Sequence, residues 1–181
     1  MDLHTKHLID KFVKREISKE EFVEGLPSNL KNNSNEFRNF LLEIIKSKNP
    51  EDLQNALTIM WLLRKEKEQN DILNELIIQN WHTRHEDIIH ELQKQKNPKS
   101  IPYIKEAMQS KYDYLVSFGT GIRQFISQCG HALSSIGTKE AIKVIEDLSK
   151  SNDPIMRDEM LYRLSKINNV GNYTRNYDFD N

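Results

Sequence analysis

Apolar side chains recur every three or four residues along most of this chain, which is the spacing of one buried face of an α-helix. The clearest run is Ile122, Ile126, Cys129 and Leu133. The pattern predicts an all-α chain without strands. The expected helices cover about residues 3–15, 19–25, 35–47, 51–65, 69–79, 82–95, 99–109, 121–136, 139–150 and 154–167.

Several helix starts are marked by their capping residues. Ser18 and Glu21 have the spacing of a capping box. Asn49-Pro50, Asn97-Pro98 and Asp153-Pro154 each place a side-chain acceptor before a proline, which suits the first turn of a helix. These pairs fix the expected boundaries better than periodicity alone.

The helical pattern repeats within the chain. Aligning Leu92 with Leu133 also aligns His90 with His131, and Leu133-Ser-Ser-Ile136 matches Leu164-Ser-Lys-Ile167. A helix pair repeated at roughly 30–45 residues is the mark of a solenoid, because one pair cannot bury its apolar face alone. We therefore predict an α-solenoid of antiparallel helix pairs with about ten helices.

We expect residues 1–170 to form a single helical-repeat domain. Residues 1–80 lack the repeat signature and are expected to be divergent capping helices, whereas residues 81–167 carry the repeats. Residues 171–181 show no helical periodicity, so we expect a flexible or partner-ordered tail there.

Composition excludes several classes of function. The 26 basic and 27 acidic residues nearly cancel, so no strong field would attract nucleic acid. Cys129 is the only cysteine and lies in an apolar row, which indicates a core residue rather than a reactive thiol. The start of the chain lacks the features of a secretory signal, and no apolar run is long enough to span a membrane. We expect a soluble, cytoplasmic protein with no membrane contact.

The segment from Trp81 to His90 raises the question of a metal site. His82, Glu86 and His90 are four residues apart, so one continuous helix would place them on a single face suited to zinc or iron. His85 falls in the apolar row of the same helix, where a hydrogen-bonded core histidine is the simpler interpretation. No second His-Glu pair occurs at the aligned positions, so we predict neither a metal nor another cofactor.

Two other groups of residues are candidates for partner contact. His90, His131 and Tyr162 occupy equivalent positions of successive repeats and would form either a solvated face or a contact surface. The aromatic residues between Tyr112 and Phe118 would either anchor a partner or pack beneath the connection. No nucleophile elbow, phosphate-binding glycine loop or paired-cysteine site is present, so we predict that the chain is not an enzyme.

The segment Trp81-His82-x-x-His85-Glu86-Asp87, followed by Asn97-Pro98 and by Gly130-His-Ala-Leu-Ser-Ser-Ile-Gly-Thr-Lys-Glu-Ala-Ile142, resembles HEAT-repeat proteins of the phycobilin-lyase-like type. More narrowly, it is similar to small bacterial HEAT-like proteins encoded beside polymorphic or contact-dependent toxins. The resemblance covers about residues 80–167 and brings no catalytic residues with it.

This resemblance implies an immunity protein that binds a cognate toxin, often a nuclease, one to one and occludes its active site or substrate groove. Acidic residues would then meet the cationic groove. The acidic candidates are Glu86, Asp87, Glu91, Asp113, Glu146, Asp147, Asp178 and Asp180, and the other candidate contacts are His90, Tyr112, Tyr114, His131 and Tyr162. The alternatives are a general adaptor or scaffold, and a metal-dependent hydroxylase or lyase using His82, His85, Glu86 and His90.

Overall fold

The computed structural model describes residues 1–117 and 121–168, and within them the regular elements are all helical. The predicted all-α class is therefore confirmed. The chain divides into two compact units, one formed by residues 1–69 with 81–83 and the other by residues 70–80 with the chain from Arg84 onward. None of the helices in the described residues is both long and apolar enough to cross a bilayer.

The first unit contains five α-helices and a short 3-10 helix. These are α1 (Leu3–Val13), α2 (Lys19–Gly25), α3 (Ser28–Asn32), α4 (Ser34–Ser47), α5 (Pro50–Leu62) and η1 (Glu66–Gln69). Contacts join α1 to α2, and α4 to both α3 and α5. The core of this unit includes Phe22, Phe37, Leu53 and Leu57, which are fully buried.

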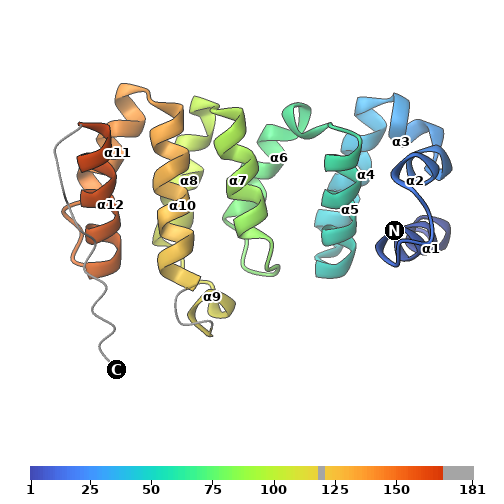
Figure 1. The fold of residues 1–181 in the computed structure, drawn as a ribbon, viewed down its shortest axis with the longest axis horizontal. Helices are drawn as coiled ribbons and strands as arrows, with labels where there is room; N and C mark the ends of the chain where they lie inside the picture. Colours follow the sequence, from blue (N-terminus) through green and yellow to red (C-terminus); the bar gives the residue numbers. More distant parts are fainter. Residues whose placement is uncertain (118–120, 169–181) are drawn as a thin grey trace. The chain divides into compact units, whose positions relative to one another are not determined.

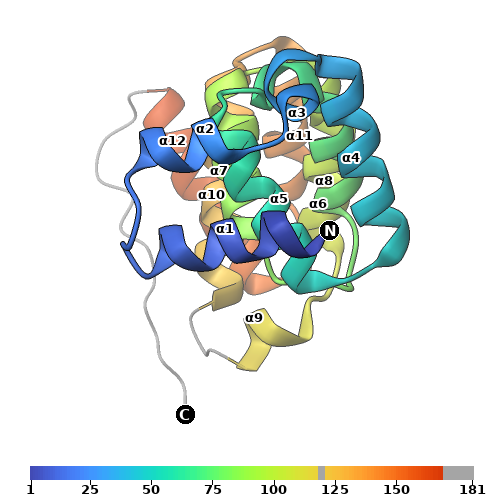
Figure 2. The ribbon, with the colours of Figure 1, turned by 90° about the vertical axis from the view of Figure 1, so that its right-hand side faces the viewer.

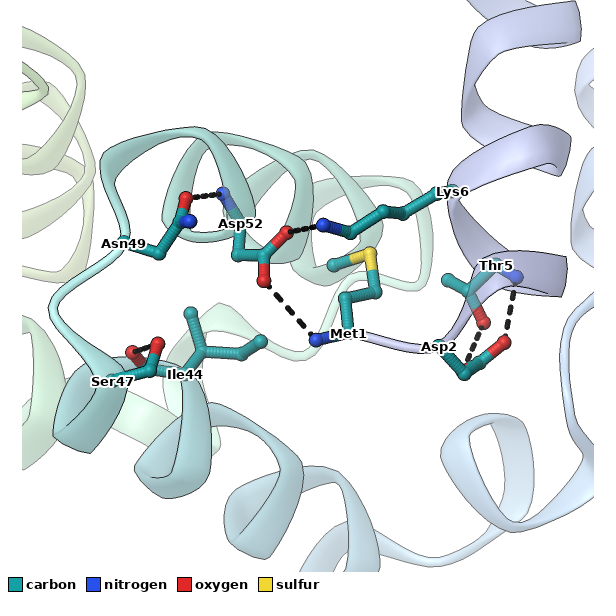
Figure 3. A network of polar contacts seen from close by, with 8 residues as sticks. All are labelled: Met1, Asp2, Thr5, Lys6, Ile44, Ser47, Asn49 and Asp52. Atoms are coloured by element: carbon teal, nitrogen blue, oxygen red, sulfur yellow. Dashed lines mark hydrogen bonds and ion pairs between the residues drawn. The ribbon is translucent and has the colours of Figure 1, made fainter.

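A network of polar contacts ties the start of α1 to α5 within this unit (Figure 3). The Asp52 carboxylate, whose side chain is 9% exposed, forms an ion pair with Lys6 Nζ at 2.8 Å and accepts from the Met1 ammonium at 3.1 Å. Burial opposes ionisation of Asp52, but the two cations outweigh burial, so the pKa of its carboxyl is lowered. Asp2 caps α1 through the Thr5 amide and hydroxyl, both at 2.8 Å.

The second unit contains seven α-helices and a 3-10 helix among the described residues. They are α6 (Asn70–Ile77), α7 (His85–Gln95), η2 (Pro98–Ser100), α8 (Ile101–Gln109), α9 (Asp113–Ser117), α10 (Gly121–Ile136), α11 (Lys139–Leu148) and α12 (Pro154–Ile167). Within this unit α7, α10 and α12 form one row, and α6, α8 and α11 form a second row (Figures 1 and 2). The central helix, α10, packs against α7, α8, α9, α11 and α12.

The predicted caps are present. Ser18 Oγ accepts from the Glu21 amide and Glu21 Oε2 accepts from the Ser18 amide, which completes the capping box. Asn49 caps α5, Asp153 caps α12, and Asn97 caps the 3-10 turn that leads into α8. Helices α10 and α12 have the predicted bounds.

Two expectations about the helices need correction. The helix expected over 82–95 begins only at His85, and its N-cap Arg84 makes no side-chain capping bond. The described residues also contain two five-residue helices, α3 and α9, that periodicity did not reveal, so the count of α-helices is twelve rather than about ten. Helices of five residues are too short to show a period of 3.6.

Candidate partner-binding surface

His85 lies at the centre of a buried aromatic cluster in the second unit. It is 0% exposed, its Nε2 lies 2.7 Å from the carbonyl oxygen of Gln79, and its Nδ1 lies 2.9 Å from Tyr114 Oη. Because a carbonyl only accepts, Nε2 carries the proton, and in the neutral ring Nδ1 accepts from the Tyr114 hydroxyl. The prediction of a hydrogen-bonded core histidine is confirmed.

Tyr112 and Tyr114 belong to the same cluster. Tyr112 is 3% exposed, its ring centroid lies 3.8 Å from that of His85, and its hydroxyl donates to the Ile77 carbonyl at 2.8 Å. Burial raises the pKa of Tyr112 to about 12 and raises that of Tyr114 further still. Both hydroxyls are thus kept protonated, and their hydrogen bonds tie Tyr112 to Ile77 of α6 and Tyr114 of α9 to His85 of α7.

The face proposed for a metal does not form. His82 precedes α7, so the four-residue spacing of His82, Glu86 and His90 does not place the three side chains on one helix face. His82 is 2% exposed, and its ring makes an edge contact with Trp81 at 5.1 Å between centroids. Among the described residues, no three His, Cys, Asp or Glu side chains are grouped so as to hold a metal ion.

The acidic candidates divide into buried and accessible residues. Glu91 is 5% exposed, and its two oxygens accept from Lys94 and Gln95, each at 3.4 Å, so it is part of the internal packing of α7. Glu86 and Asp87 lie half-buried in the first turn of α7, and Asp113 is exposed at the start of α9. Asp87 forms an ion pair with Arg84 at 2.8 Å.

The equivalent residues His90, His131 and Tyr162 lie on α7, α10 and α12, the three helices of one row. His90 and His131 are exposed and Tyr162 is half-buried, with Lys166 Nζ 5.2 Å from its ring centroid. Gln93 donates to Ser135 at 3.5 Å and so joins α7 to α10 one turn beyond the two histidines. Asp178 and Asp180, and the tail as a whole, lie outside the described residues, as does Phe118.

Sequence reasoning missed most of the outer surface of α10. The side chains opposite its buried stripe are exposed or half-buried amides, hydroxyls and one imidazole, and the single charged residue of the helix, half-buried Arg123, lies at their margin. The α10 face consists of Gln124 and His131, which are exposed, and of Ser127, Gln128, Ser134 and Ser135, which are half-buried, with the amide oxygen of Gln128 itself buried. The signal was present in the sequence as a helical stripe of amides, hydroxyls and one imidazole within a chain in which 29% of the residues are charged.

Cys129, which the apolar row of α10 places in the core, is fully buried. Burial raises the pKa of its thiol well above the usual value. The prediction of an inert core cysteine is confirmed. Comparison with known proteins adds no relative, since no family model, curated protein or solved structure matches the chain.

Proposed function

We propose that this chain is a non-enzymatic immunity protein that binds a cognate bacterial toxin one to one in the cytoplasm and occludes its active site or substrate groove. In this proposal the two rows of the second unit are three antiparallel helix pairs, α6 with α7, α8 with α10 and α11 with α12, stacked as HEAT-like repeats. Such a stack offers an extended surface whose side chains vary without loss of the core.

The observation that carries the proposal is the α10 face together with exposed His90, which gives the central helix of the row of α7, α10 and α12 an uncharged polar stripe. The buried polar groups at His85 support the same interpretation. Both imidazole nitrogens already have partners within the chain, and both neighbouring tyrosines have raised pKa values. A general base or nucleophile needs the opposite arrangement, with an available lone pair and a tuned pKa.

The proposal requires a toxin gene next to the gene of this chain, and the test is direct binding to the product of that gene, carrying a substitution that inactivates the toxin. Calorimetry and gel filtration should give a tight complex with one copy of each chain. If the two purified proteins do not associate, or if the complex leaves the active toxin fully active, the proposal is wrong.

A further inference from the structure

We propose that the partner docks on the α10 face and the adjoining part of α7, and that the partner is a protein surface with an uncharged centre and a cationic rim. This inference rests on the function proposed above and names the face and the chemistry of the partner. Two helices of the same unit, α10 and α11, differ in the chemistry of their outer surfaces.

Helix α11 shows what a solvated surface looks like in this chain. Its exposed residues are all charged: Lys139, Glu140, Lys143, Glu146 and Asp147. On α10 the outer residues are amides, hydroxyls and one imidazole, and the single formally charged residue is Arg123. Arg123 donates to Asp158 at 2.9 Å and to Glu159 at 3.1 Å, so its charge is matched within the chain.

This difference matters because removing a charged side chain from water costs far more than removing an amide or a hydroxyl. The centres of protein interfaces are accordingly depleted in lysine, glutamate and aspartate. The α10 face therefore has the composition of a surface that loses its water on binding. The bond between Gln93 and Ser135 continues the same chemistry onto α7, beside exposed His90.

Carboxylates lie at one edge of this surface. Glu86 and Asp87 are in the first turn of α7, and Asp113 begins α9. Tyr114 of α9 donates to His85 Nδ1 at 2.9 Å, and His85 is followed directly by Glu86 and Asp87, so the first turn of α7 lies close to α9. Asp87 is paired with Arg84 at 2.8 Å, so the acidic character of this edge rests on Glu86 and Asp113, which favour a cationic protein rim and repel nucleic acid phosphates.

The experiment places a lysine on helices of the two different rows of the second unit and compares the effect on binding. Gln124→Lys and His131→Lys place a charge on the α10 face, and Gln109→Lys places the same charge at an exposed position of α8. Affinity for the inactivated product of the adjacent toxin gene is measured for each variant. We expect each α10 variant to bind at least about tenfold more weakly and the α8 variant to bind like the unaltered chain.

The outcomes separate this inference from the proposed function. If the unaltered chain binds and neutralises the toxin but the α10 variants bind equally well, the docking face is wrong and the immunity function stands. If the unaltered chain does not bind, both fail. Thermal unfolding of the free variants provides a test without the partner. A fall in Tm of more than about 5 °C would show that the α10 face lacks charge because its side chains pack within the chain, and it would overturn the inference.

Discussion

Two turns of this chain share the sequence Lys-Asn-Pro and the same backbone conformation. Lys48 and Lys96 end α4 and α7 in the left-handed region, with φ of 49° and 52° and ψ of 34° in both. In each turn the following asparagine caps the next helix and proline takes its first position. A residue with a Cβ is strained by about 1–2 kcal/mol in this conformation.

Lys96→Gly should therefore stabilise the protein. We expect a gain of about 0.5–1 kcal/mol in the free energy of unfolding, because relief of the strain exceeds the extra entropy of glycine in the unfolded chain. Urea denaturation measures the change. Lys105→Gly, within α8, is the control and should cost about 1 kcal/mol; a loss of stability at Lys96 as well would contradict the strain argument.

Tyr114→Phe should destabilise the protein by about 1–3 kcal/mol, because it leaves the buried Nδ1 of His85 without its donor. Tyr103→Phe is the matched control. The Tyr103 hydroxyl donates to exposed Glu75 at 3.1 Å, so its loss should cost less than about 0.5 kcal/mol. Equal effects of the two substitutions in denaturant unfolding would show that the buried hydrogen bond to His85 adds no more to the free energy of unfolding than the exposed bond of Tyr103.

Asp52 makes stability depend on pH in the acid range. Its folded-state pKa is lowered, so its ion pairs stabilise the protein above the ordinary carboxyl value of about 4 and lose this contribution as the pH falls through the folded-state value. Asp52→Asn should be less stable than the unaltered chain at pH 7, and the difference should shrink below about pH 4. Melting curves from pH 7 to pH 3 test this, with the exposed residue Asp10 changed to Asn as control; a constant difference would refute it.

At the scale of the helices, the link between α10 and α12 depends on charge. Arg123 of α10 reaches Asp158 and Glu159 of α12, and Glu159 is only 1% exposed. Arg123→Gln should lower the free energy of unfolding by about 2 kcal/mol, because it removes two charge-assisted hydrogen bonds. Arg157→Gln, on the exposed side of α12, should have a much smaller effect in the same unfolding assay, and a similar loss at both positions would contradict this role of Arg123.

Helix ends were predictable where a side chain marks them. The prolines and caps at Asn49 and Asp153, and the capping box at Ser18, each specify a boundary through local hydrogen bonds. The turn between α10 and α11 is similar, because Gly137 supplies a φ of 69° and Thr138 caps α11. The start of α7 has no capping side chain. The helix predicted there from apolar spacing therefore began too early, at His82 instead of His85.

At the scale of the molecule, the class of fold and the core histidine could be predicted from periodicity. Buried positions recur along each long helix, and His85 occupies one of them. The candidate surface could not be predicted in the same way. Whether Glu91 and Tyr112 are buried depends on which neighbouring helix each one meets, and helical spacing alone does not specify that. The α10 face carries no charged or aromatic motif that would mark it in the sequence, because its distinguishing property is the absence of charge.

If this chain neutralises a toxin by binding it, it should protect cells that produce the toxin, and their growth is the decisive measurement. The active product of the adjacent toxin gene is expressed alone or together with this chain, and surviving colonies are counted. The unaltered chain and Gln109→Lys should restore growth equally, whereas Gln124→Lys should give fewer surviving colonies. Cells that die equally with and without the unaltered chain would contradict the account.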